Sequence, residues 1–223
     1  MKYIIILLLA VTLVACSKMG DPIAEYVKNG ELIYATRVDS LKVIGGKERI
    51  RLTWILPPNK TAVKTIVHWN AGKNTKEFIL PASATGVYEG LLDPMAEGSY
   101  LFNVFTEDRI GNKSVGLTIA GSAYGNNYQN SILNRNIVST SVNRDSVLIN
   151  WGSAERGNVA TALTYTDVDG IDRRLLIKST EQKSVVKRVK KGSSIAFQGL
   201  YLPEALSTDT FRVAKKDFLL IDP

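Results

Sequence analysis

The chain has 223 residues, 45% apolar composition and a formal net charge of +7 from 28 basic and 21 acidic side chains. This length and apolar content are enough to bury one or two ordinary hydrophobic cores. The charges are spread widely, which is typical of a soluble surface with a mild basic bias. The single cysteine excludes an intramolecular disulfide, so the fold must be stable through packing alone.

The first sixteen residues combine a positive start, a short apolar run and that cysteine. The apolar run from Tyr3 to Val14 has about twelve residues, whereas a bilayer span needs roughly 20. Residues 1–15 are therefore predicted to be a secretory signal peptide. The sequence Leu-Val-Ala-Cys that ends at Cys16 resembles a bacterial lipobox. The resemblance implies cleavage before Cys16, lipidation of Cys16 and a place in the cell envelope. An exported lipoprotein is not expected to bind nucleic acid.

Residues 16–35 are predicted to form a tether, and from Val38 onward the apolar pattern changes to a period of two. The clearest case is Arg49–Trp54, which alternates strictly. Short runs of this kind recur at regular spacing, separated by Gly, Pro and Asn. Seven strands are expected in about 85 residues, which favours an antiparallel β-sandwich. They lie near Val38–Val43, Arg49–Trp54, Val63–Trp69, Glu77–Leu80, Val87–Leu92, Tyr100–Thr106 and Val115–Ile119.

The chain then repeats this pattern. Ser146–Trp151 matches Arg49–Trp54 at an offset of 97 residues. A competing register aligns Phe197–Pro203 with Tyr88–Pro94, but it would leave the second sandwich with an open edge, which promotes aggregation. We therefore expect the register that keeps seven strands. The predicted organisation is a signal peptide, tether, first sandwich, linker and second sandwich at residues 1–15, 16–35, 36–121, 122–134 and 135–223.

Two resemblances follow from these motifs. The segment Asp108-x-x-Gly111-Asn112-x-Ser114 is similar to the last hairpin of many bacterial fibronectin type III domains. Over nearly all of residues 16–223, the chain resembles a family of Bacteroidota surface lipoproteins of unknown function. That likeness rests on Cys16-Ser-Lys-Met19, Gly30-Glu31, Tyr34, Asp39-Ser40, Leu52-x-Trp54, Trp69-Asn70, Tyr124-Gly125 and Tyr201-Leu-Pro-Glu with Asp209-Thr-Phe211. It implies tandem fibronectin type III-like sandwiches, often found beside glycan-uptake systems, and it supplies no catalytic residues.

The sequence offers little for catalysis. His68 is the only histidine, and no Gly-x-Ser-x-Gly nucleophile motif accompanies it. We predict that the chain is not an enzyme, needs no cofactor and has no metal site. Asp167-Val-Asp-Gly-Ile-Asp172 resembles a calcium loop, but the bidentate glutamate is not in its expected pattern. Asp169-Gly170 between two strands is instead predicted to be a hairpin turn. A basic run from Lys183 to Lys191 is interpreted as a solvated strand whose lysines block edge pairing.

Aromatic residues give the remaining candidates. Trp54 and Trp151 end alternating strands on the apolar face, so both are predicted to be core residues. Trp69 is open: its own strand places it in the core, whereas the repeat at offset 97 turns it outward. Tyr124 and Tyr128 lie in the linker, where they either pack the domain junction or form an aromatic platform. Trp69, Tyr124 and Tyr128 are our candidate ligand-binding residues, with a glycan as the ligand.

The sequence thus predicts an all-β protein of two tandem fibronectin-III/immunoglobulin-like β-sandwiches behind a lipoprotein signal and short tether. The function expected is that of a non-catalytic binding or scaffolding module in the outer membrane, held there by lipid on Cys16. Its expected partners are the membrane, a glycan or other outer-membrane proteins. The alternative is a structural spacer that contacts only protein partners.

Overall fold

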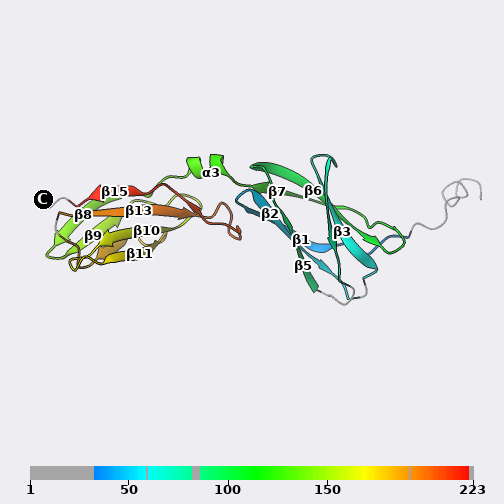
Figure 1. Ribbon diagram of the computed structural model, residues 1–223, viewed down its shortest axis with the longest axis horizontal. Coiled ribbons are helices and arrows are strands. Elements are labelled where there is room, and N and C mark those ends of the chain that lie inside the picture. The colour runs from blue at the N-terminus through cyan, green and yellow to red at the C-terminus, as the bar shows by residue number, and fades with distance from the viewer. Residues whose placement is uncertain (1–32, 59, 82–85, 191, 221–223) are drawn as a thin grey trace, which may run out of the picture.

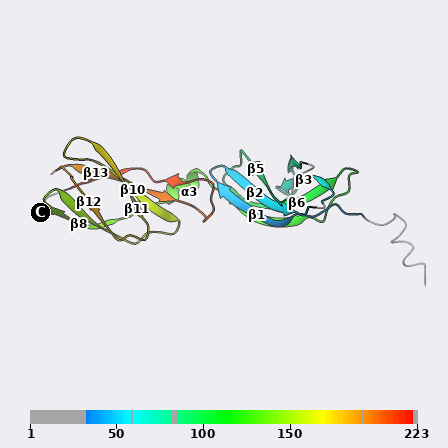
Figure 2. The same ribbon diagram turned by 90° about the horizontal axis from the view of Figure 1, so that it is seen from below.

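The computed structural model describes residues 33–58, 60–81, 86–190 and 192–220. The predicted signal peptide, the lipidation site Cys16 and residues 16–32 of the tether lie outside the described residues. Within the described part, two β-sandwiches lie end to end, and a segment that contains the short helix α3 (Asn126–Ser131) joins them (Figures 1 and 2). The prediction of an all-β protein with two tandem sandwiches is confirmed.

The first sandwich has two antiparallel sheets. A three-stranded sheet has the order β1-β2-β5 and faces a four-stranded sheet with the order β4-β3-β6-β7. The strands are β1 (Asp39–Gly46), β2 (Arg49–Leu56), β3 (Ala62–Trp69), β4 (Asn74–Ile79), β5 (Gly86–Leu92), β6 (Gly98–Asp108) and β7 (Leu117–Ala123). The seven strands occur in the predicted order, but β1 runs through Gly45 and Gly46, which the sequence analysis placed after the strand.

Strict alternation in β2 builds the first core. Ile50, Leu52 and Trp54 point between the sheets and are at most 1% exposed. The Trp54 ring lies 5.7 Å from the Phe78 ring and 6.3 Å from the Tyr88 ring, measured between centroids. Burying each of these large side chains contributes roughly 1.5–3 kcal/mol. The prediction that Trp54 is a core residue is confirmed.

The second sandwich repeats this plan with one change. Its sheets are β12-β9-β8 and β11-β10-β13, and both β14 and β15 pair with the free side of β13. The last strand of the sandwich is therefore split in two. The strands are β8 (Ile137–Asn143), β9 (Ser146–Trp151), β10 (Asn158–Thr166), β11 (Asp172–Lys178), β12 (Lys183–Val186), β13 (Ser194–Tyr201), β14 (Phe211–Arg212) and β15 (Lys216–Leu219).

The second core is built like the first. Val147, Ile149 and Trp151 of β9 face inward and are at most 4% exposed, which confirms the prediction for Trp151. The indole Nε1–H of Trp151 donates to Ser184 Oγ at 2.8 Å, and its ring lies 5.5 Å from that of Phe197. Phe197 belongs to β13, which pairs with β10 as β6 pairs with β3. The register that keeps seven strands is therefore correct, and the competing register is wrong.

The predicted hairpin turn at Asp169-Gly170 joins β10 to β11, which pair antiparallel. The Asp167 carboxylate is buried and accepts hydrogen bonds from the backbone N–H groups of Ile171 and Asp169, each at 2.9 Å. It also forms an ion pair with Arg173, whose Nε donates to Asp167 Oδ2. These bonds, led by the one from Ile171, hold the pKa of Asp167 below its usual value. Because Asp167 is already bonded within the turn, the acidic run is explained by turn formation.

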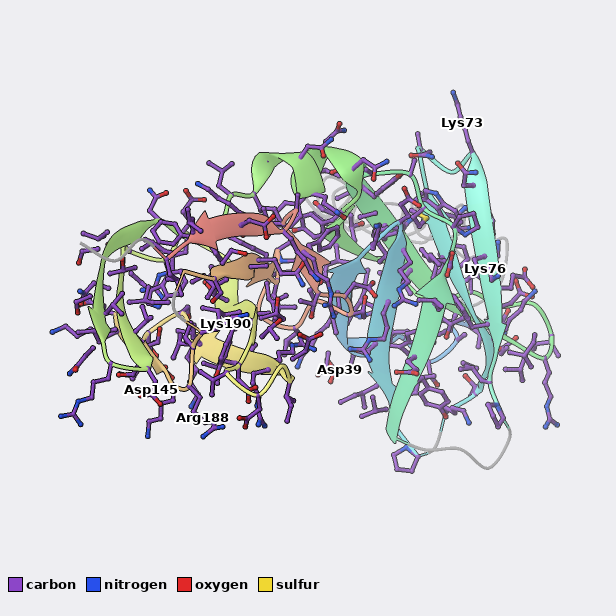
Figure 3. The ribbon with its side chains drawn as sticks, turned by 60° about the vertical axis from the view of Figure 1, so that its left-hand side comes forward. Asp39, Lys73, Lys76, Asp145, Arg188 and Lys190 are labelled. Atoms are coloured by element: carbon purple, nitrogen blue, oxygen red, sulfur yellow. The ribbon has the colours of Figure 1, made fainter. Side chains whose placement is uncertain are left out.

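The predicted basic strand is the edge strand β12, where Val186 is buried and Lys183 is exposed. Its basic continuation, with Arg188 and Lys190, lies on the second sandwich (Figure 3). Arg188 forms an ion pair with Asp169 across the β10–β11 turn. The interpretation as a solvated edge is confirmed for this part of the chain.

Candidate functional site

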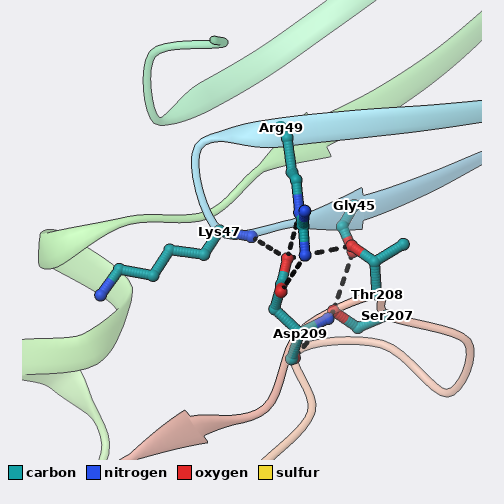
Figure 4. Close-up of polar contacts among 6 residues, drawn as sticks. All are labelled: Gly45, Lys47, Arg49, Ser207, Thr208 and Asp209. Carbon is teal, nitrogen blue, oxygen red and sulfur yellow. Dashed lines mark hydrogen bonds and ion pairs between the residues drawn. The ribbon is translucent and has the colours of Figure 1, made fainter. Parts of the chain in front are cut away.

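The most elaborate polar arrangement of the described chain lies where the two sandwiches meet. The turn between β1 and β2 contacts a loop of the second sandwich, residues 202–210, that follows β13 (Figure 4). Gly45 N–H donates to Glu204 Oε1 at 2.9 Å, and the Gly45 carbonyl accepts from Ser207 Oγ at 2.8 Å and from Thr208 N–H at 3.2 Å. The backbone of β1 is thus bonded directly to the second sandwich. We call this contact the junction.

Two glycines make this close approach possible. A Cβ atom at Gly45 would overlap the Ser122 carbonyl oxygen and the Glu204 carboxylate. A Cβ atom at Gly46 would overlap Thr208 Oγ1 and the Asp209 carboxylate. At Gly46 the space that a side chain would need is occupied by groups of the second sandwich, and at Gly45 it is shared between β7 of the first sandwich and Glu204 of the second. The junction therefore requires residues without a side chain at both positions.

An ion pair lies at the centre of the junction. Arg49 Nε donates to Asp209 Oδ2 at 2.8 Å, and Arg49 Nη2 donates to Asp209 Oδ1, which makes a two-pronged contact. Asp209 Oδ2 also accepts from Lys47 N–H at 2.8 Å and from Thr208 Oγ1 at 3.0 Å (Figure 4). The Arg49 hydrogen bond is the largest influence that lowers the pKa of Asp209 from 3.8 to about 2. Fork-like arginine–carboxylate pairs fix orientation as well as distance.

The linker is attached to the first sandwich. Tyr124 N–H donates to the Gly46 carbonyl at 3.0 Å, and Glu48 N–H donates to the Tyr124 carbonyl at 2.7 Å. Helix α3 begins on the carboxylate of Glu97, which accepts N–H bonds from Asn127 and Tyr128 at 2.7 Å each. Burial opposes ionisation of Glu97, but these backbone donors hold its pKa below the usual value. The first part of the predicted linker is therefore ordered by bonds to the first sandwich.

The ring of each linker tyrosine packs against the second sandwich. The Tyr128 ring lies 4.9 Å from that of Phe211 at an interplanar angle of 81°, and the Tyr124 ring lies 5.2 Å from that of Tyr128. Tyr201 and Ile132 complete this small core, and Tyr201 Oη donates to the Leu133 carbonyl at 2.7 Å. Burial raises the pKa of Tyr124 and of Tyr128. The structure thus brings Tyr124 and Tyr128 together, and it places them in the junction.

Trp69 lies apart from these two tyrosines, in the four-stranded sheet of the first sandwich. It is partly buried against the first core, and its ring centroid lies 6.4 Å from that of Phe102. The inward pair of β10, Leu163 and Tyr165, corresponds to Val67 and Trp69 at an offset of 96 residues. Trp151 and Leu163 are 12 positions apart, whereas Trp54 and Val67 are 13 positions apart, so the chain between these core residues is one residue shorter in the second sandwich. The prediction that Trp69 points outward relied on an offset of 97 and is wrong, because Trp69 packs against the first core.

Trp69 also borders a groove on the surface of the first sandwich. Other residues that line this groove are His68, Leu101, Asn103 and Phe105. His68 stacks on Phe105 with ring centroids 5.0 Å apart, and its Nδ1 is 3.4 Å from Thr75 Oγ1. Among the described residues, no group of three His, Cys, Asp or Glu side chains is placed to hold a metal ion.

No pattern in the sequence groups Gly45, Gly46, Arg49 and Asp209. They come from segments about 160 residues apart, and nothing local in either segment indicates the contact. One signal was present: Asp209 and Phe211 belong to the motif that carried the family resemblance, yet they follow the last well-patterned strand. Distinctive residues in a segment without strand periodicity are typical of a contact surface. The polar groups of this set bond to other protein groups, so what the set does in the structure is hold the two sandwiches together.

The chain is similar to one protein family and to several solved structures. A family model described as a domain of unknown function matches residues 16–211. No curated protein matches the chain. The chain is similar to a segment of two fibronectin type III domains from chicken tenascin, at 14% identity and a TM-score of 0.33, covering 82% of this chain and 98% of that one. It is also similar to the FN1–FN3 domains of chicken CNTN1, at 12% identity and a TM-score of 0.43, covering 83% of this chain and 66% of that one. The fold class itself, two tandem antiparallel β-sandwiches, rests on the sheet topology of the described chain.

Proposed function

We propose that this chain, which belongs to the DUF4998 family of domains of unknown function, is a non-catalytic, lipid-anchored scaffold of the cell envelope. In this proposal the junction fixes the second sandwich at a set distance and orientation from the first. The first sandwich is held near the membrane by lipid on Cys16, and the second presents its surface to partners farther out. The resemblance described above adds the outer membrane of a Bacteroidota cell, beside a glycan-uptake system, as the proposed setting.

The junction is the observation that carries the scaffold proposal. Two sandwiches that served only as independent binding modules would need no more than a flexible connection. Here the Arg49–Asp209 fork, the backbone bonds of Gly45 and the Tyr124–Tyr128–Phe211 packing act together. A contact with several directional bonds and a small apolar core favours one arrangement over a range of arrangements. A fixed arrangement is what a spacer or scaffold requires.

The lipid anchor is supported by the predicted signal peptide of residues 1–15, which directly precedes Cys16, and by the family match, which begins at Cys16. No helix in the described part of the chain is long and apolar enough to cross a membrane. Two or three acyl chains give stable attachment to a bilayer, since one chain alone binds only marginally.

The anchor is tested by expressing the full chain in a bacterial host that acylates lipoproteins. The wild type is expected to incorporate an alkyne-tagged fatty acid and to sediment with membranes, and Ser17→Ala should behave in the same way. Cys16→Ala should lose both properties. If Cys16→Ala is still labelled and still membrane-bound, the anchor proposal is overturned.

A second candidate function is weak glycan binding in the groove beside Trp69. The observation that favours it is the stacked pair of His68 and Phe105, with the 63%-exposed Leu101 and the Asn103 amide in the same groove. Aromatic and apolar surface can cover a sugar ring while an amide bonds its hydroxyl groups. Tyr124 and Tyr128 contribute less to this proposal, because their rings pack against Phe211.

A glycan array probed with the full chain tests this second candidate. A dissociation constant between high micromolar and millimolar, corresponding to about 4–6 kcal/mol, is expected for so small a contact. Phe105→Ala should abolish the signal, while Leu219→Ala on the second sandwich should leave it intact. An array on which the wild type binds no glycan would exclude this candidate and leave the scaffold proposal unaffected.

A further inference from the structure

The first sandwich has one end that lies farthest from the junction, and the described chain begins there (Figure 1). Thr36 is bonded to this end: Thr61 N–H donates to Thr36 Oγ1 at 2.9 Å, and Thr106 Oγ1 donates to the Thr36 carbonyl at 2.6 Å. We call the surface formed by Lys60, Thr61, Ile79 and residues 108–110 the basal pole. The attachment of Thr36 means that any lipid on Cys16 is connected to the molecule at the basal pole.

Two large apolar side chains project from the basal pole. Ile110 is 81% exposed and Ile79 is 77% exposed, and both line one shallow groove together with Lys60 and Arg109. The turn that carries Ile110 is well built, since Asp108 Oδ1 accepts from the N–H groups of Ile110 and Asn112 at 3.0 and 2.9 Å. Ile110 is therefore held outward by an ordered turn. Because both isoleucines line one groove, they give the basal pole an apolar surface that a partner layer can cover.

Basic side chains lie beside these isoleucines. Arg109 is exposed beside Ile110, and Arg37 is exposed next to Thr36. The nearby carboxylates are engaged: Asp108 is bonded within its turn, and Glu107 and Glu77 form ion pairs with Lys64 at 3.0 and 3.3 Å. Basic side chains interleaved with exposed apolar ones fit a surface that has anionic groups above an apolar layer. A bilayer with anionic lipid headgroups is such a surface.

We propose that the basal pole rests on an anionic lipid surface, with Ile79 and Ile110 in the headgroup region and Arg109 near lipid phosphate. This inference rests on the proposed lipid anchor. Residues 17–32 separate Cys16 from the first described residue, and such a length spans at most roughly 60 Å. A tether of this length allows the pole to reach the membrane without forcing it there. The contact need only be weak, because the anchor keeps the pole at a high effective concentration next to the bilayer.

The experiment uses the full chain, acylated at Cys16, in vesicles of phosphatidylglycerol and, separately, of phosphatidylcholine. Acylation blocks the native thiol, so that one new cysteine can carry a fluorophore. Ile110→Cys places the fluorophore on the basal pole, and Leu219→Cys, at a position that is 57% exposed in the second sandwich, is the matched control. Lipids with a quencher in the headgroup then report contact. Strong quenching is expected at position 110 on phosphatidylglycerol only, and little at position 219 on either lipid.

Charge variants test the role of arginine. Arg109→Glu should lower the ratio of molecules with the basal pole on the lipid surface to molecules with it free of the surface at least fivefold. Each basic side chain near an anionic surface changes that equilibrium by about this factor. Arg174→Glu, an exposed position on β11, should leave the ratio unchanged. Raising the salt concentration to about 1 M, where the screening length is about 3 Å, should weaken the quenching at position 110.

Each outcome bears on a distinct claim. If the acylated chain fails to float with vesicles, the anchor is overturned and the pole contact falls with it. If the chain floats but position 110 is quenched no more than position 219, the pole contact alone is overturned. Equal quenching on both lipids contradicts the role of anionic headgroups. Protection of position 110 only after envelope proteins are added would assign the pole to a protein partner and would also overturn the proposal.

Discussion

Arg49 and Asp209 lie 160 residues apart in the chain, yet the guanidinium of Arg49 donates to both carboxylate oxygens of Asp209. Each residue belongs to a different sandwich, so this fork fixes how the two sandwiches sit relative to one another. The fork can be broken without disturbing either core, because Arg49 and Asp209 are both partly exposed, at 37% and 22% of their side chains. The arrangement of the sandwiches can therefore be tested separately from their stability.

Asp209→Asn is expected to loosen the junction. Lowering the pKa of Asp209 from 3.8 to about 2 corresponds to at most about 2.5 kcal/mol, and exposure of the pair reduces this to about 1–2 kcal/mol. Spin labels on Lys73→Cys in the first sandwich and Arg174→Cys in the second measure the effect as a distance distribution (Lys73 is labelled in Figure 3). Asp209→Asn should broaden the distribution. Asp169→Asn, which removes an ion pair within the second sandwich, should not.

The same fork predicts a response to acid. Because the pKa of Asp209 is lower in the docked arrangement, its contribution is fully present above pH 3.8 and is lost as the pH falls toward about 2. The distance distribution should therefore broaden in that interval in the wild type. In Asp209→Asn the distribution should already be broad at neutral pH and should change little. Equal acid sensitivity in the two proteins would contradict the assignment to Asp209.

Gly46→Ala should open the junction by steric overlap. Its methyl group would meet Thr208 Oγ1 and the Asp209 carboxylate, so the contact must move apart to accommodate it. Gly152→Ala is the matched control, because the nearest atom to its new methyl group is the Asn136 carbonyl oxygen at 3.5 Å, an ordinary contact. Distances between the same two labels should change in Gly46→Ala alone. An unchanged distribution in Gly46→Ala would mean that the junction does not depend on this close approach.

Tyr128→Ala is expected to destabilise the junction and to lower the melting temperature. Its ring contacts Phe211 and Tyr124, and loss of a packed aromatic ring from an apolar cluster typically costs 3–5 kcal/mol when the ring is fully buried and less here, where burial is partial. Differential scanning calorimetry measures the effect. If the melting temperature is unchanged while binding to a glycan is lost, Tyr128 is a ligand residue and its packing role is minor.

Trp54→Ala and Trp151→Ala should each destabilise their own sandwich by roughly 3–5 kcal/mol, since both rings are at least 96% buried. Replacement by phenylalanine should lower the free energy of unfolding by different amounts at the two positions. Trp151→Phe removes the donor to Ser184 Oγ, whereas Nε1 of Trp54 has no hydrogen-bond partner among the described residues. Trp151→Phe is therefore expected to cost more than Trp54→Phe in denaturant unfolding. A larger loss for Trp54→Phe would contradict this account.

The two cores could be predicted from the sequence because strict alternation assigns a face to each residue. Ile50, Leu52 and Trp54 follow that rule without interruption, and so do Val147, Ile149 and Trp151. Trp69 could not be assigned from the repeat, because the chain from the core tryptophan to the inward pair is one residue shorter in the second sandwich, and a shift of one residue reverses every face that is inferred by alignment. The strand's own pattern, with Val67 and Trp69 on one side, gave the correct answer.

The junction could not be predicted, since its bonds join segments whose separation in the chain carries no information about distance in space. The first strand is predicted near Val38–Val43, and the adjacent glycines Gly45 and Gly46 after it would usually mark its end. In the structure the same pair continues β1 and admits the other sandwich. Tyr124 and Tyr128 lie after β7 in the segment that joins the sandwiches, and the choice between the two alternatives for them depended on contacts that a sequence does not contain.

Asn134 occupies the place where the last strand of the second sandwich is interrupted. Its Oδ1 accepts from Gly199 N–H at 2.7 Å, and its Nδ2 donates to the Ala214 carbonyl at 2.7 Å, between β14 and β15. The Asn134 side chain thus takes up hydrogen-bonding groups of the backbone that a continuous edge strand would use for pairing. Split runs of two and four residues give a neighbouring copy little backbone to pair with. Copies packed densely in one plane would therefore resist joining their sheets through this edge of the second sandwich.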